Sequence, residues 1–146
     1  FDRNATAVTY DLFHGQWHLH RTGTVAAFPF GFGLSTTTFA MGDDIAFDAA
    51  TRSAHVTVAN TGSRDAATVV QVYGGYEASD YERPAWRLVG FARVDIPAAG
   101  TKRLAISVDL RMLDVRVDGA MVREPGPIRL RAAFHADDPG AAVTLA

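Results

Sequence analysis

The sequence predicts an all-β fold, an antiparallel β-sandwich of about seven strands that follows an extended N-terminal segment. From about Phe39 onward, apolar and polar residues alternate in short runs, the pattern of strands with one buried and one solvent-facing side. Gly, Pro, Asn and Asp interrupt these runs at spacings of roughly ten residues, where they supply turn conformations. Helical periodicity is nearly absent from this region, so strands are expected to build the core.

The first three expected strands lie at residues 55–58, 69–73 and 88–96. Alternate valines share one face of the first strand, and Asn-Thr-Gly at residues 60–62 supplies the turn after it. The third strand ends at Pro97, because proline lacks the N–H that a central strand donates. The apolar or small residues expected on one face of this third strand are Leu88, Gly90, Ala92, Val94 and Ile96.

The clearest strand is expected at residues 104–108, where Leu, Ile and Val alternate with polar or small residues. Asp-Gly at residues 118–119 predicts a tight hairpin over residues 115–123, because a two-residue type I′ turn needs positive φ at both positions. The last two strands are expected at residues 128–134 and 143–145. This number of strands and this turn spacing are typical of an immunoglobulin or fibronectin type III-like sandwich.

The sandwich is expected to occupy residues 36–146, and residues 1–35 to form a connector that cannot fold alone. An extended segment is expected over residues 10–21, and three phenylalanines follow within residues 28–32. Because each phenylalanine ring can bury well over about 100 Å² of surface, the cluster needs a partner surface. The residues expected to pack between the sandwich and another domain are Phe28, Phe30, Phe32 and Trp17.

The composition excludes several classes of function. Hydrophobic residues make up 48% and charged residues 21% of 146 residues, as in ordinary globular domains. A net charge of −2 offers no broad positive field, so neither nucleic acid nor a membrane surface is expected as a partner. No stretch is apolar enough to cross a membrane, and the absence of cysteine excludes thiolate metal sites. The chain starts at Phe1 rather than Met, and we expect it to be a piece of a longer polypeptide.

Residues 28–35, Phe-Pro-Phe-Gly-Phe-Gly-Leu-Ser, resemble the junction stretch of glycoside hydrolase family 3 enzymes. Downstream segments resemble the fibronectin type III-like domain of that family in the same order, and residues 10–15 look like the last extended segment of its α/β-sandwich domain. The downstream segments are residues 56–62, 69–73, 83–84, 88–91, 93–94 and 124–126.

The resemblance implies a parent enzyme that hydrolyses terminal β-glucosides or β-xylosides with retention. Retaining chemistry needs two carboxyl groups about 5 Å apart, and in the family these lie in the preceding domains. The resemblance therefore implies that this chain has no catalytic residue, needs no cofactor, is inactive alone and has the catalytic domains of its own polypeptide as its partner.

Three groups of residues were considered as local sites. The acidic pairs Asp43-Asp44 and Asp137-Asp138 stand beside Gly or Pro, and we interpret them as turn residues rather than as catalytic carboxylates. His14, His18 and His20 have the same parity on the expected extended segment, so all three could project from one face and bind zinc. A strand face packed on another domain explains these histidines as well, and no metal site is assigned.

The third group is an aromatic and charged stretch over residues 73–86. The composition of this stretch favours packing against the catalytic domains, because aromatic residues and arginine are enriched at protein interfaces. The alternative is contact with carbohydrate, for which the candidates are Tyr76, Tyr81 and Trp86. We expect the whole chain to be a non-catalytic accessory domain that braces the catalytic domains and borders the substrate entrance. The alternative is a free-standing carbohydrate-binding or interaction module.

Overall fold

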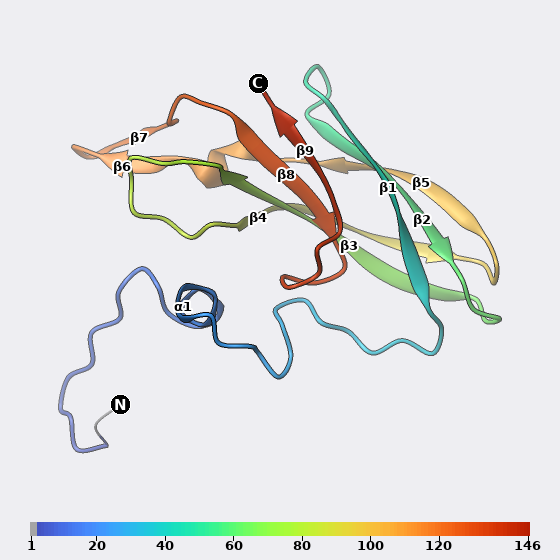
Figure 1. Ribbon diagram of the computed structural model, residues 1–146, viewed down its shortest axis with the longest axis horizontal. Coiled ribbons are helices and arrows are strands. Elements are labelled where there is room, and N and C mark those ends of the chain that lie inside the picture. The colour runs from blue at the N-terminus through green and yellow to red at the C-terminus, as the bar shows by residue number, and fades with distance from the viewer. Residues whose placement is uncertain (1–2) are drawn as a thin grey trace.

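The computed structural model describes residues 3–146 and has the predicted all-β sandwich architecture. One sheet has the strand order β1-β2-β5 and the other β4-β3-β8-β9, and every pairing is antiparallel (Figure 1). The two sheets together have seven strands, as expected. The first sheet is built from β1 (Phe39–Asp48), β2 (Ser53–Asn60) and β5 (Thr101–Ser107), and the second from β3 (Ala66–Tyr76), β4 (Arg87–Ile96), β8 (Ile128–Ala133) and β9 (Ala141–Leu145).

The core lies between the two sheets and is made of alternate residues of each strand. In β2 the side chains of Val56 and Val58 are fully buried; Ile106 of β5 lies in the same sheet, and Leu130 of β8 belongs to the opposite sheet. Burying an aliphatic side chain of this size contributes about 1.5–3 kcal/mol. The alternation predicted for these three strands is therefore confirmed.

The predicted hairpin is also present, outside the two main sheets. Strands β6 (Val115–Val117) and β7 (Ala120–Val122) pair with each other, and a 3₁₀ turn, η1 (Leu110–Leu113), leads into them. Asp118 and Gly119 both have positive φ, 48° and 86°, as a type I′ turn requires. This turn was predictable because its conformation depends on two adjacent residues alone.

A β-bulge in β4 overturns one part of the predicted face. Gly90 pairs with Val72 but Leu88 pairs with Tyr73, so Val89 is an extra residue in its strand. The bulge reverses the alternation, and Val89 points into the core while Leu88 packs on the opposite side of the sheet. The prediction that Leu88 shares a face with Val94 and Ile96 was therefore wrong.

A second bulge corrects the placement of Asp43 and Asp44. They lie inside β1 rather than in a turn, between Met41, which pairs with Val58, and Ile45, which pairs with Val56. Both aspartates are exposed. The bulge lets the strand carry these residues outward while Ile45 returns to the core.

The N-terminal part is not wholly extended, because residues 16–22 form the short helix α1 (Gln16–Thr22). Glycines with positive φ stand at both of its ends, and Gly23, in the left-handed conformation, donates its N–H to the carbonyl of His20. Fewer than two helical turns give too little periodicity to recognise in the sequence. In Figure 1, α1 and the connector run along one side of the sandwich below β3 and β4. No helix among residues 3–146 is long and apolar enough to cross a membrane.

Candidate functional site

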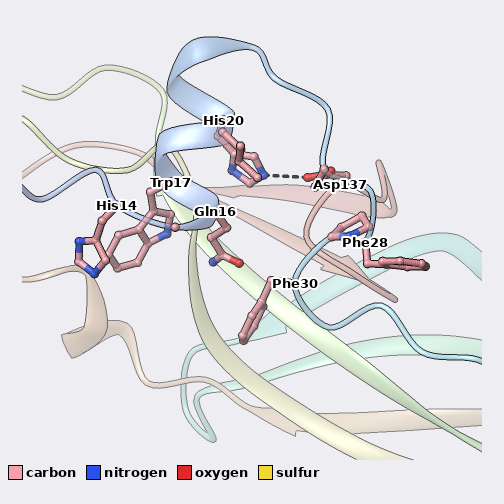
Figure 2. Close-up of a pocket in the computed structure, with 11 residues that line it drawn as sticks. His14, Gln16, Trp17, His20, Phe28, Phe30 and Asp137 are labelled. Atoms are coloured by element: carbon pink, nitrogen blue, oxygen red, sulfur yellow. Dashed lines mark hydrogen bonds and ion pairs between the residues drawn. The ribbon is translucent and has the colours of Figure 1, made fainter. Parts of the chain in front are cut away.

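A hollow of about 540 Å³ lies where α1 and the connector meet the turn that follows β8 (Figure 2). Its walls are mainly apolar and aromatic, with a few polar groups among them. The labelled lining residues are His14, Gln16, Trp17, His20, Phe28, Phe30 and Asp137.

Three of the four residues expected at an interdomain contact line this hollow. Trp17, Phe28 and Phe30 lie around it, and Phe32 contacts Phe28 from outside with a ring separation of 5.5 Å. The exposed fractions are 74% for Phe28, 49% for Phe30 and 43% for Phe32. Three exposed aromatic rings therefore lie close together on one segment of the connector.

The connector that carries these rings is fixed to the sandwich by backbone hydrogen bonds. The N–H of Ala136 donates to the carbonyl of Phe30 over 2.9 Å. The side-chain amide of Gln71 donates to the carbonyls of Phe134 and Gly31, at 2.8 and 3.3 Å, and accepts the hydroxyl of Tyr73 at 2.6 Å. The exposed phenylalanines therefore stand on an ordered segment.

Gly31 is required for this attachment. Its φ is 79°, a conformation that side chains other than glycine rarely adopt. A Cβ at this position would also overlap the side-chain amide of Gln71. Gly31 thus has a structural role at the junction, whereas the Cβ position of Gly33 is open.

Helix α1 is joined to the sandwich by charged and aromatic contacts. His20 Nε2 lies 2.7 Å from a carboxylate oxygen of Asp137, with each side chain about one-third exposed (Figure 2). Arg21 and Glu82 approach to 3.4 Å but are mostly exposed, so this pair adds little. The guanidinium of Arg87 lies over the ring of Trp17, 5.5 Å from its centroid.

The helix also changes the interpretation of the three histidines. On a helix, residues 18 and 20 point in nearly opposite directions, about 200° apart, so they cannot share one face. His20 binds Asp137, and His14 contacts the carbonyl of Asp11 at 2.8 Å. Among residues 3–146 no three His or acidic side chains converge as metal ligands would. The zinc hypothesis depended on the prediction that the three histidines share one face, and that prediction was wrong.

The acidic pair after β8 lies in a turn, as predicted. Asp138 accepts the backbone N–H groups of Phe134 and Gly140, at 2.7 and 3.1 Å, while Asp137 binds His20. Both carboxylates therefore have structural partners.

Of the three carbohydrate-contact candidates, Tyr76 is buried with 6% of its surface exposed. Its hydroxyl donates to the carbonyl of Glu124 at 2.8 Å, and burial raises its pKa. Tyr81 is 38% exposed, and Trp86 is half-buried against the guanidinium groups of Arg129 and Arg131. The three rings therefore do not form one open platform.

A buried ion pair between Arg83 and Glu124 was not foreseen as a contact. The two groups are 2.7 Å apart, and their side chains are only 8% and 6% exposed. Glu124 also accepts hydrogen bonds from the Ser79 hydroxyl and the Asp80 N–H, both 2.7 Å long. Arg83 and Glu124 both lie in segments that resemble the family. They are 41 positions apart, and nothing in the sequence indicated that they contact each other.

Burial alone raises the pKa of Glu124, but the hydrogen bonds from Ser79 and Asp80 and the charge of Arg83 outweigh it. The pKa of Glu124 is therefore below its ordinary value. This carboxylate stays ionised and bound to Arg83, which also donates to the carbonyl of Leu113 at 3.0 Å. Such a group fixes the loop at residues 77–86 and is not poised to act as a general acid.

Comparison with known proteins agrees with this architecture. Residues 68–136 match the fibronectin type III-like domain family. The chain is 40% identical to β-glucosidase B of Emericella nidulans over 59% of this chain and 10% of that protein. It is 39% identical to xylan 1,4-β-xylosidase of Xylanibacter ruminicola over 63% of this chain and 11% of that protein.

The fold likeness extends further along the chain. The solved structure of a family 3 β-glucosidase from Bifidobacterium adolescentis superposes with a TM-score of 0.79 and 29% identity, over 91% of this chain and 20% of that one. This chain thus spans about a tenth of the curated relatives named above and a fifth of the solved one. The chain therefore contains a fibronectin type III-like domain and is similar, in sequence and in fold, to the part of glycoside hydrolase family 3 enzymes that carries this domain.

Proposed function

We propose that this chain is a non-catalytic accessory domain of a glycoside hydrolase family 3 enzyme, and that it braces the catalytic domains. The parent activity under this proposal is retaining exo-hydrolysis of terminal β-D-glucosides or β-xylosides. The names of the relatives support this class, since one is a β-glucosidase and another a β-xylosidase. The small share of each relative that the chain spans supports a domain within a longer polypeptide.

The proposal rests on one observation: the phenylalanines of the junction are exposed, although the segment that carries them is ordered. Phe28 and Phe30 are largely exposed around a hollow of about 540 Å³, yet the segment that carries them is hydrogen-bonded to Ala136 and Gln71. A fixed apolar surface of this kind fits a permanent partner, because no reorganisation is needed when it packs. We assign the catalytic body as that partner.

The loop at residues 77–86 is proposed to border the substrate entrance. Its attachment through Arg83 and Glu124 holds Tyr81 at the surface in one conformation. A rigid, partly exposed tyrosine can contact a sugar at little cost in conformational entropy. Tyr76 has no such role in this proposal, because its ring belongs to the core.

The first test is the mass of the natural polypeptide that carries this sequence, captured from its source with an antibody raised against the sandwich. We expect a mass several times 15.7 kDa. A mass near 15.7 kDa would contradict the accessory role and favour a free-standing module, which sugar-binding titrations on Trp17→Ala and Trp86→Ala variants would then examine.

The second test is activity. The isolated chain is expected to hydrolyse neither aryl β-glucosides nor aryl β-xylosides, because under this proposal the two catalytic carboxyl groups lie in the other domains of the parent enzyme. Turnover by the pure chain that disappears when one of its own acidic residues is changed would overturn the proposal.

A further inference from the structure

The outer face of the four-stranded sheet carries a group of arginines stacked on aromatic rings. The guanidinium carbon of Arg131 lies 4.6 Å from the ring centroid of Trp86 and 5.3 Å from that of Tyr73. That of Arg129 lies 5.1 Å from Trp86. We call Trp86, Arg87, Arg129 and Arg131 the arginine–tryptophan face.

The strand register explains why these residues meet. Arg129 and Arg131 are alternate residues of β8, so both point away from the core, and they pair with Gly75 and Tyr73 of β3. A Cβ at Gly75 would overlap the carbonyl oxygen of Ala85 and would only touch the ring of Trp86, at 3.5 Å. The glycine thus lets the backbone that carries Trp86 approach the sheet closely.

The arginines of this face have no ion-pair partner within residues 3–146, although Asp137 and Asp138 partly offset the charge of Arg131 from a distance. None of the six ion pairs formed among residues 3–146 includes Arg87, Arg129 or Arg131. The Nε groups of Arg129 and Arg131 are buried and have no acceptor within the part of the chain described. Arg131 donates to the carbonyl of Ala136 at 2.6 Å, and the nearby Asp137 and Asp138 are engaged elsewhere.

This cluster is unusual because the chain as a whole has a net charge of −2. A general excess of basic residues does not explain it. Arginine and tryptophan are the residue types most enriched among the energetically dominant contacts of protein interfaces. The planar guanidinium group matches a carboxylate with two parallel hydrogen bonds, which gives both affinity and orientation.

The face is also continuous with the aromatic junction. Arg87 lies over Trp17, which lines the hollow beside Phe28 and Phe30. An apolar centre and adjoining arginines together have the composition of a protein interface. The indole of Trp86 is covered by guanidinium groups, which leaves it poorly placed to stack on a sugar ring.

We propose that Arg87 and Arg129 bind carboxylate side chains of a partner protein surface, and that this partner is an acidic surface of the catalytic body. The inference rests on the proposed function, which supplies the partner, and adds the chemistry of the contact. Arg131 has a supporting role, since it holds Trp86 and the turn at Ala136 in place.

The test compares charge reversal at this face with charge reversal on the other sheet. Arg129→Glu is introduced into the natural polypeptide, and Arg103→Glu is the matched control, because Arg103 is exposed on β5. The measurement is the rate at which limited proteolysis releases a fragment that carries the sandwich. We expect release at least about tenfold faster in Arg129→Glu and unchanged in Arg103→Glu, since reversal replaces attraction by repulsion. Arg129→Lys, which keeps the charge but loses the second parallel hydrogen bond and the stacking on Trp86, is expected to fall between the wild type and Arg129→Glu.

Two further measurements distinguish a failure of this inference from a failure of the proposed function. Raising NaCl from about 0.05 M to about 0.5 M is expected to speed release from the wild type but not from Arg129→Glu. If Arg129→Glu lowers the stability of the isolated chain, Arg87→Glu replaces it at the edge of the face. Equal release rates for the variants of this face and for Arg103→Glu would overturn the inference and leave the accessory role intact. A natural polypeptide near 15.7 kDa would overturn both.

Discussion

The guanidinium of Arg83 lies 2.7 Å from the carboxylate of Glu124, and both side chains are more than nine-tenths buried. This contact joins the loop after β3 to the end of the β6–β7 hairpin, and hydrogen bonds from Ser79 and Asp80 complete it. Burying such a pair is costly, but breaking it leaves one uncompensated buried charge.

Arg83→Met is expected to lower the Tm of the isolated chain by roughly 5–15 °C, because Glu124 loses its counter-charge while still buried. Thermal unfolding followed by circular dichroism measures the change. Arg93→Met is the control, since its pair with Asp95 is mostly exposed, and a shift within about 2 °C is expected. Equal shifts in the two variants would contradict the role of the buried pair.

The pair also predicts a dependence of stability on pH. The pKa of Glu124 is lower in the folded state than its ordinary value of 4.5, so the folded state favours the ionised form. This stability is fully present above the unfolded pKa and is lost as pH falls through the folded pKa. We expect the free energy of unfolding of the wild type to fall more steeply below about pH 4.5 than that of Glu124→Gln.

Urea unfolding at several pH values, with Glu124→Gln beside the wild type, isolates this contribution from that of Asp109, whose pKa is lowered to about 2 by hydrogen bonds from Arg111. The difference in stability between the two proteins should narrow as the pH is lowered. A constant difference from pH 7 down to pH 3 would show that Glu124 has no such linkage.

Gly31→Ala is expected to release the connector without unfolding the sandwich, because the new Cβ overlaps Gln71 and φ is 79°. Proteolytic cleavage within residues 28–35 should become at least about tenfold faster, while the Tm changes by less than about 3 °C, since local opening involves few core contacts. Gly33→Ala is the matched control, because nothing lies within 4 Å of its Cβ position. Similar cleavage rates in both variants would argue against a fixed junction.

The aromatic junction should bind an apolar dye in the isolated chain. The double variant Phe28→Ser and Phe30→Ser is expected to reduce the fluorescence of bound anilinonaphthalene sulfonate by at least about half, with the Tm unchanged, because both rings are largely exposed. Met121→Ser, on the distant hairpin, controls for loss of any exposed apolar side chain. Dye binding that persists in the double variant would place the apolar surface elsewhere.

Leu130→Ala is expected to destabilise the domain by about 2–5 kcal/mol, because Leu130 is completely buried between the sheets. Urea unfolding measures this change. Val69→Ala, on the same sheet but 40% exposed, should cost less than about 1 kcal/mol. Comparable losses in both would indicate that the core is loosely packed.

The elements that the sequence predicted correctly are those governed by neighbouring residues. Alternation in β2, β5 and β8 follows from side chains two positions apart, and the Asp118-Gly119 turn from one dipeptide. The clustering of Trp17 with Phe28 and Phe30 could be predicted in part from the sequence, because exposed aromatic rings need a common surface. Their contact with an absent domain remains a prediction.

The errors arose where pairing with another strand altered the local pattern. The bulge at Val89 transferred Leu88 to the outer side of the sheet, and the bulge before Ile45 drew Asp43 and Asp44 into a strand. Helix α1 was missed because seven residues between two glycines resemble a loop as much as a helix. At Leu88 the alternation was real but was counted across a bulge, whereas Asp43 and Asp44 were assigned to a turn only because they follow a glycine.

The sequence by itself determined the fold class, the hairpin, the core alternation of three strands and the presence of an aromatic connector, because these depend on local periodicity and turn chemistry. Only the tertiary structure decided that Tyr76 is buried, that Glu124 binds Arg83, and that Arg129 and Arg131 stack on Trp86. Those contacts join residues tens of positions apart. The physical reason is that strand register and bulges set which side chains meet, and register is fixed by the packing of the whole sandwich rather than by any single segment.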